Sequence, residues 1–304
     1  MNDKTWAPYL FLTPFWVLFA VFGVFPILFS LYLMFQQWDP VQGLGAMKYV
    51  GLENIQFAIE DPWVWTSLLN TVWLAALSGI PQHLVAVPLA YLINERLSKG
   101  RNWVMGAYFL PYITSTVAIA MMFSTLFSTD YGLINSMLQQ MANWPLLKEL
   151  LPQSNIDWLG SPQTIKPVIA LVVFWRYVGF NTILYVAALQ GIPRDQYEAA
   201  RMDGASPWRI FWYITLPQLK PMMYFGVTLT MVGGLQLFEE PFILTGGKGG
   251  VEQSGMTTAM YMYRTAFEFN DFGLASAIAW MLFVIIAVMT YATHKAFKSP
   301  GEEA

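Results

Sequence analysis

The chain has 304 residues, of which 56% are hydrophobic and 12% are charged, and its formal net charge at pH 7 is −3. Soluble domains average about 25% charged residues, so this composition excludes an ordinary globular core and favours a protein with several membrane spans. Cysteine is absent and only two histidines occur, which excludes a disulfide framework and argues against a metal site, while the small negative charge gives no basis for nucleic-acid binding.

Six segments stay apolar for the roughly 20 residues that cross a bilayer core. In chain order they are Tyr9–Phe35, Leu68–Ile93, Trp103–Phe127, Pro167–Leu189, Met222–Leu244 and Phe272–Thr293. The loops between them are too short to form a domain with its own core, and no internal repeat or linker separates them. The sequence therefore predicts an all-α membrane protein with six transmembrane helices, in which residues 1–304 form a single transmembrane domain.

Prolines interrupt several of these segments, at Pro14, Pro26, Pro81, Pro88, Pro111 and Pro241. Within a bilayer a proline kink is tolerated when neighbouring helices satisfy the carbonyl that it frees. We therefore expect a packed bundle of helices rather than six independent anchors.

The basic residues predict how the bundle is oriented, because cytoplasmic loops carry an excess of lysine and arginine. One side holds ten of the 16: Lys4, Arg96, Lys99, Arg101, Arg194, Arg201, Arg209, Lys220, Lys295 and Lys298. The other side holds five on longer loops: Lys48, Lys148, Lys166, Lys248 and Arg264. We therefore expect both termini, and the loop between the fourth and fifth spans, to be cytoplasmic.

That loop, about residues 193–221, has the features of a short helix pair. Pro193 suits a first helical turn, and Gly204 provides a break where φ can be positive. Ser206 can cap a second helix, which we expect Pro217 and Pro221 to end. One interpretation is an amphipathic hairpin that only anchors the loop at the membrane surface.

A second interpretation comes from the order of residues in Glu198–Ala200, Asp203–Ala205 and Ile214–Pro217, which resembles the EAA loop of permease subunits of ABC importers. In that family the first helix of the loop is the coupling helix, and it sits in a cleft of the ATPase subunit. The resemblance implies that Glu198 makes a polar contact there and that Gly204 forms the turn. The implied ATPase-coupling residues are Tyr197, Glu198, Ala199, Ala200, Asp203 and Gly204.

Three flanking motifs, Gly51–Asn54, Leu244–Gly247 and Tyr263–Phe267, are similar to the carbohydrate-uptake branch of these permeases, and in particular to the larger subunit of the maltose permease. The chain lacks that subunit's two additional N-terminal spans and its large periplasmic insertion. The resemblance implies a bacterial cytoplasmic (inner) membrane, a second permease subunit, two ATPase subunits and an extracytoplasmic sugar-binding protein. No G-x-x-x-x-G-K-[ST] loop occurs, so we expect ATP and Mg to bind the separate ATPase subunits, and no cofactor or metal to bind this chain.

One charge, Arg176, falls inside the fourth span, where a charged side chain costs roughly 3 kcal/mol on insertion scales and usually faces a cavity or a partner. Glu239 and Glu240 lie near the outer end of the fifth span, so one of them can pair with Arg176. Such a pair either fastens two helices together or belongs to a substrate site, and the sequence leaves both open.

Aromatic and small residues accompany Arg176. Tyr177 and Phe180 share its helix face, and Gly233-Gly234 leaves room in the fifth span, although paired glycines also allow close helix packing. Rings and polar groups in a concave site suit sugars, and the resemblance places sugar contacts of the maltose-type subunit at most of these positions. The candidate substrate-binding residues are Arg176, Tyr177, Phe180, Thr230, Gly233, Gly234, Gln236, Leu237 and Glu240. Gln82 and His83 are expected first to form hydrogen bonds between helices, and second to line the pathway.

These observations predict the transmembrane subunit of an ATP-driven sugar importer, with no catalytic residues of its own. The rivals are a secondary transporter, which is expected to show internal repeats, and a membrane-embedded transferase built on Arg176 and the neighbouring carboxylates, which would need a nucleophile or a metal set. Polyols, disaccharides, oligosaccharides and glycerol phosphates all remain candidate cargoes.

Overall fold

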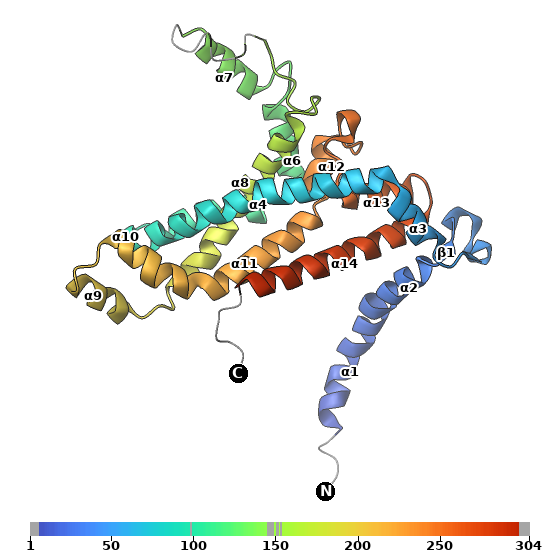
Figure 1. Cartoon of the computed structure of the whole chain (residues 1–304), viewed down its shortest axis with the longest axis horizontal. Coiled ribbons are helices and arrows are strands. Elements are labelled where there is room, and N and C mark those ends of the chain that lie inside the picture. The colour runs from blue at the N-terminus through green and yellow to red at the C-terminus, as the bar shows by residue number, and fades with distance from the viewer. Residues whose placement is uncertain (1–5, 98, 145–148, 150–151, 153, 298–304) are drawn as a thin grey trace. The chain divides into compact units, whose positions relative to one another are not determined.

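The computed structural model describes residues 6–97, 99–144, 149, 152 and 154–297, and nearly all of their regular structure is helical (Figure 1). Five helical stretches are long and apolar enough to cross a membrane, and there are six if one bent pair of helices counts as a span. The prediction of an all-α membrane fold is confirmed. The chain divides into two compact units, residues 1–65 with 261–285 and residues 66–260 with 286–304.

The first unit contains the N-terminal helix and two very short strands that pair antiparallel. Its elements are α1 (Ala7–Phe19), the π turn η1 (Ala20–Val24), α2 (Phe25–Leu33), β1 (Gln36–Gln37), the 3-10 turns η2 (Pro40–Gln42) and η3 (Leu44–Ala46), β2 (Lys48–Tyr49) and α3 (Glu53–Glu60), with residues of α13 (Thr258–Phe267) and α14 (Phe272–Phe297). The Asn54 amide donates to the carbonyls of Met34 and Gln36, at 3.0 and 2.8 Å. Gly273 lies so close to the Gln36 carbonyl that a Cβ atom would overlap it.

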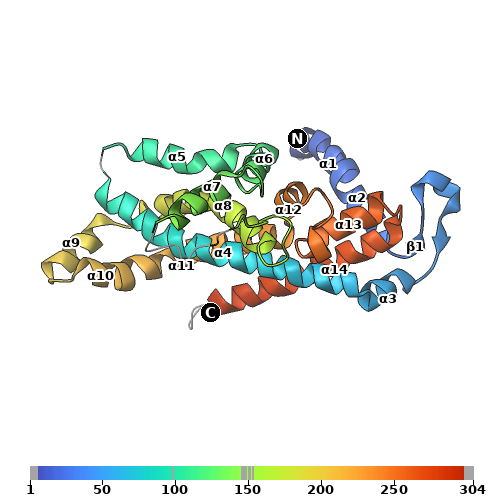
Figure 2. The ribbon, with the colours of Figure 1, turned by 90° about the horizontal axis from the view of Figure 1, so that it is seen from above.

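The second unit is built around one central helix. Its elements are most of α4 (Pro62–Arg96), α5 (Arg101–Ile113), α6 (Thr116–Leu126), α7 (Leu133–Ala142), α8 (Ile165–Leu189), α9 (Arg194–Met202), α10 (Pro207–Ile210), the π turn η4 (Phe211–Thr215), α11 (Leu216–Leu235), α12 (Glu239–Leu244) and the 3-10 turn η5 (Val251–Gln253). The central helix is α8, which packs against α5, α11 and α12, and Figure 2 shows α5 running beside it. Gly179 of α8 touches the Tyr108 carbonyl of α5, so the two backbones approach closely because the glycine has no side chain.

Two buried apolar clusters hold this unit together. One gathers residues of α4, α8, α9, α10, η4 and α11, and we name it the loop cluster: Ala86, Val87, Ala90, Ile93, Val178, Tyr185, Val186, Leu189, Ile192, Tyr197, Ile210, Phe211 and Leu219. The other joins α6, α8 and α12 through residues such as Ile119, Ile169 and Leu244. The 193–221 loop is thus part of a packed core and not a free hairpin.

The third predicted span, Trp103–Phe127, is broken in the structure. Helices α5 and α6 meet at an angle of 91° across a break of a few residues. Thr114 has an extended backbone, with ψ of 148°, and Ser115 is also non-helical, with ψ of 128°. The Thr114 hydroxyl donates to the Leu110 carbonyl at 2.7 Å, a local bond of the kind that competes with helix continuation.

The expectation that Pro217 and Pro221 end the second loop helix is wrong. From Pro207 to Leu235 the elements α10, η4 and α11 follow one another without a break. A proline ring in an α-helix clashes with the carbonyl four residues earlier, and a π turn widens the helix at that point. Both π turns in the described chain, η1 and η4, end two residues before a proline, Pro26 and Pro217. The chain thus continues through Pro217 with a widened turn just before the ring, whereas Pro221 lies inside the α-helix α11 without one.

Candidate functional site

The predicted coupling loop forms a short helix, a glycine turn and a capped second helix. Helix α9 carries Asp195 in its first turn, where the helix dipole favours negative charge. It ends before Gly204, whose φ is +78°, and the Ala205 amide closes the turn by donating to the Ala200 carbonyl at 2.9 Å. The Ser206 hydroxyl accepts from the Arg209 amide at 3.4 Å and so caps α10. The predicted turn and cap are both present.

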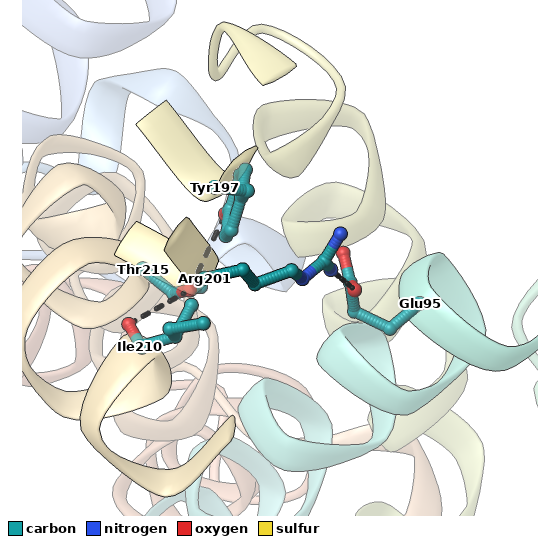
Figure 3. Close-up of polar contacts among 5 residues, drawn as sticks. All are labelled: Glu95, Tyr197, Arg201, Ile210 and Thr215. Atoms are coloured by element: carbon teal, nitrogen blue, oxygen red, sulfur yellow. Dashed lines mark hydrogen bonds and ion pairs between the residues drawn. The ribbon is translucent and has the colours of Figure 1, made fainter. Parts of the chain in front are cut away.

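One face of α9 points into the second unit (Figure 3). Tyr197 is buried, and its hydroxyl lies 3.3 Å from Oγ1 of Thr215, which donates in turn to the Ile210 carbonyl at 3.4 Å. Burial raises the pKa of the Tyr197 phenol, although the Thr215 hydrogen bond lowers it, so the hydroxyl keeps its proton near neutral pH and can donate. Arg201 reaches Glu95 of α4, with 2.8 Å between Nη2 and Oε2.

The opposite face of α9 is open. Glu198, Ala199, Asp203 and Gly204 are exposed, and Met202 is 88% exposed. The predicted coupling residues therefore divide into an inward group, Tyr197 with the partly buried Ala200, and an outward group available to another protein.

The second candidate site is centred on an ion pair between α8 and α12. Arg176 Nη1 lies 2.7 Å from Glu240 Oε1, and the two side chains are 12% and 3% exposed. The guanidinium also lies over the Tyr177 ring, 5.1 Å from its centroid. The predicted pairing of Arg176 with one of the two neighbouring carboxylates is confirmed for Glu240, whereas Glu239 is exposed.

Three aromatic rings lie beside this pair. Tyr112 of α5 stacks on Phe180 with 4.5 Å between centroids, and it meets Tyr177 edge-on at 5.7 Å. Sequence reasoning found Tyr177 and Phe180 but missed Tyr112, which lies far away in the chain. The only sequence signal for it is its place next to Pro111, in the middle of the predicted third span, and in the structure it lies near the end of α5, just before the break.

The remaining candidate residues do not all join this group. A Cβ on Gly233 would meet nothing within 4 Å, whereas one on Gly234 would lie 2.8 Å from the Cβ of Ala75, so Gly234 is where α11 packs on α4. Gln236 is exposed, and Leu237 is buried in the core. Thr230 faces α4 and α8, with its hydroxyl 3.5 Å from the Asn181 amide nitrogen that donates to it.

A groove of about 1160 Å³ runs along α4, α10, η4 and α11, and its lining is largely apolar. His83, Glu95, Arg96, Arg201 and Thr230 are among its polar lining residues. His83 Nδ1 lies 2.7 Å from the Tyr185 hydroxyl, and the Asn181 amide donates to Gln82 Oε1 at 3.0 Å. The predicted hydrogen bonds between helices are confirmed for Gln82 and His83, and His83 also lines the groove. Within the described residues, no group of three or more histidine, aspartate or glutamate side chains could hold a metal ion.

Comparison with known proteins identifies the family and the fold of the chain. Residues 84–295 match the family described as binding-protein-dependent transport system inner membrane component. The probable ABC transporter permease protein YurN of Bacillus subtilis (strain 168) is 33% identical over 304 residues, which is 100% of both chains. The arabinooligosaccharides transport system permease protein AraP of the same organism is 33% identical over 98% of this chain and 92% of its own. A bacterial alginate ABC transporter, solved in complex with an alginate pentasaccharide-bound periplasmic protein, has the same fold, with a TM-score of 0.80 at 24% identity over 96% of this chain and 93% of that chain.

Proposed function

The chain belongs to the inner-membrane components of binding-protein-dependent transport systems, and from this premise we propose that it is one permease subunit of an ATP-driven sugar importer. Members of this family are transporter components and not enzymes, so the transferase and secondary-transporter alternatives are not favoured. The resemblance drawn from the loop residues is confirmed by the family match.

Sugar as the cargo has two supports. AraP, at 33% identity over nearly the whole chain, is named for the transport of arabinooligosaccharides. In this chain the rings of Tyr112, Tyr177 and Phe180 lie together beside a polar ion pair. Aromatic faces with a few convergent polar groups are the usual composition of a small-molecule site.

The assembly follows from the family. This subunit pairs with a second permease, two ATPase subunits bind the cytoplasmic loops, and an extracytoplasmic binding protein delivers the sugar. ATP and Mg belong to the ATPase subunits, because the chain contains no G-x-x-x-x-G-K-[ST] phosphate loop. Each ligand shifts the balance between inward-open and outward-open states only through its different affinity for the two.

The observation that carries the coupling role is the geometry of α9. A nine-residue helix, closed by Gly204, presents Glu198 and its neighbours on an open face while its other face is anchored in the loop cluster. This arrangement suits a surface that receives force from a docked partner and passes it into the helices.

The experiment compares Glu198→Lys with Glu60→Lys, an equal change of charge at an exposed residue of α3. We expect Glu198→Lys to release the ATPase subunits from the purified complex, or to leave them bound but uncouple ATP turnover from uptake. Glu60→Lys should keep the ATPase subunits bound. Normal ATPase binding together with normal uptake by the Glu198→Lys complex would show that α9 is not the contact.

We propose further that both compact units serve a single permease domain over residues 1–304, with both termini in the cytoplasm. The excess of lysine and arginine on that side supports this orientation. A reporter fused after Lys99 or at the C-terminus should read as cytoplasmic, and one fused near Asn54 as external. The reverse pattern of reporter activity would contradict the topology and, with it, the placement of α9.

A further inference from the structure

The contacts behind α9 have a role of their own. We propose that Arg201 and Glu95 are positioning residues which, with Tyr197 and Thr215, hold α9 rigidly to both α4 and α11. Movement of α9 then carries the two helices as one block. The proposal rests on the proposed function, in which the opposite face of α9 receives the ATPase subunit.

The attachment to α4 is the Arg201–Glu95 ion pair, which joins residues far apart in the chain across 2.8 Å (Figure 3). The Arg201 side chain is 55% exposed and that of Glu95 is 23% exposed. An exposed pair contributes little to stability on its own. We assign it instead a role in orientation, because it holds the C-terminal half of α9 against the end of α4.

The attachment to α11 has two parts. The Tyr197 hydroxyl meets Thr215 inside the core, and the Gln218 amide donates to Gln196 Oε1 at 2.6 Å on the surface. Thr215 is the last residue of η4, two residues before Pro217, where the ring fixes φ. The tyrosine is therefore bonded to the turn that leads directly into α11.

Packing connects these attachments. Tyr197 belongs to the loop cluster, which also contains Ile93 of α4, Leu189 of α8 and Phe211 of η4, and Ala200 packs against it. Close-packed interiors resist compression and transmit strain. With one core and two polar attachments, α9 cannot tilt without moving α4 and α11.

A charge-reversal experiment tests the ion pair in the complete complex with the second permease, the ATPase subunits and the binding protein. The readout is the ratio of ATP turnover with and without the sugar-loaded binding protein. We expect Arg201→Gln and Glu95→Gln each to lower this ratio by up to about fivefold, the factor that corresponds to about 1 kcal/mol for an exposed pair. The double variant Glu95→Arg with Arg201→Glu should restore it.

The matched control is Arg209→Gln, because Arg209 is an exposed arginine of the same loop that forms no ion pair within the described residues. It should leave the ratio unchanged. An unchanged ratio in both single variants, or a double variant that stays uncoupled, would overturn the role of the pair. Release of the ATPase by Arg201→Gln would also overturn it, because Arg201 would then be a direct contact.

Cross-linking tests rigidity, and because this chain has no native cysteine, each introduced pair supplies the only two thiols of the subunit. Glu95→Cys with Arg201→Cys ties α9 to α4, and Gln196→Cys with Gln218→Cys ties α9 to α11, each through a short bis-maleimide. We expect both linked complexes to keep turning over ATP, and the first link to recover the ratio lost with the ion pair. Arrest of turnover by either link would mean that α9 moves relative to that helix, which contradicts the proposal.

The two proposals fail in different ways. If Glu198→Lys leaves ATPase binding and coupling intact, then α9 is not the contact. If Glu198→Lys uncouples while the Arg201 and Glu95 variants behave as wild type, then α9 is the contact but is not positioned by the ion pair.

Discussion

Substitutions in the Arg176–Glu240 pair can show whether this ion pair only joins α8 to α12 or also belongs to the substrate site. Glu240→Gln removes the negative charge that balances Arg176, whose side chain is only 12% exposed, and leaves only neutral acceptors, the new amide oxygen and the Tyr177 hydroxyl at 3.4 Å. Removing one partner of a buried pair typically destabilises a protein by 3–5 kcal/mol. Because Arg176 keeps some exposure, we expect about 3 kcal/mol, at the lower end of that range. Thermal unfolding of the purified complex, followed by intrinsic fluorescence, measures it.

The double variant Arg176→Met with Glu240→Leu removes both charges. Replacing a buried ion pair by apolar residues of similar volume is often neutral or stabilising, so we expect the midpoint of unfolding to return toward that of the wild type. Uptake by this double variant should nevertheless be lost, because the polar groups beside the three rings are gone. Wild-type uptake by the double variant would show that the pair only fastens α8 to α12. An unchanged midpoint in Glu240→Gln would refute the energetic reasoning itself.

Other substitutions test the same region. Gly233→Leu should abolish uptake while the complex still assembles, because the space at Gly233 is open, whereas Gly234→Leu should reduce the yield of folded protein, because Ala75 lies 2.8 Å from the added Cβ; equal assembly of the two would contradict this distinction. Tyr112→Ala should weaken uptake about as much as Tyr177→Ala, by a factor of roughly five, if each removes an aromatic contact worth about 1 kcal/mol. A normal uptake rate in Tyr112→Ala would place the sugar away from these rings.

The sequence predicted those parts of the fold that depend on local pattern. Long apolar runs identified the spans, Gly204 marked the turn of the loop, and Ser206 marked the cap of the second loop helix. Each of these features depends on only a short stretch of sequence. The sequence also predicted that Arg176 pairs with Glu239 or Glu240, because a charge inside the membrane requires a partner and few carboxylates were available.

What the sequence could not predict depends on which surfaces meet. Gly233 and Gly234 are the same residue at adjacent positions, yet one is open and the other packs on a helix more than a hundred residues earlier in the chain. Tyr112 joins Tyr177 and Phe180 because α5 lies against α8, where Gly179 lets the two backbones approach. No periodicity within α5 or α8 contains that information.

The prolines show how a correct local rule gave a wrong boundary. A proline does break the regular α-helical bonding, and on that ground Pro217 was expected to end a helix. The chain instead adds a residue to the turn before the ring, and the π turn lets the helix continue into α11.

The continuity of the helix through Pro217 has a functional consequence, because a helix that ended at Pro217 would leave the loop as a separate hairpin. Continuity from Pro207 to Leu235 joins Tyr197 of α9, through Thr215, to the same continuous helix that carries Gly233. We therefore expect a displacement of the loop to be passed along this single element toward Thr230 and Gly233.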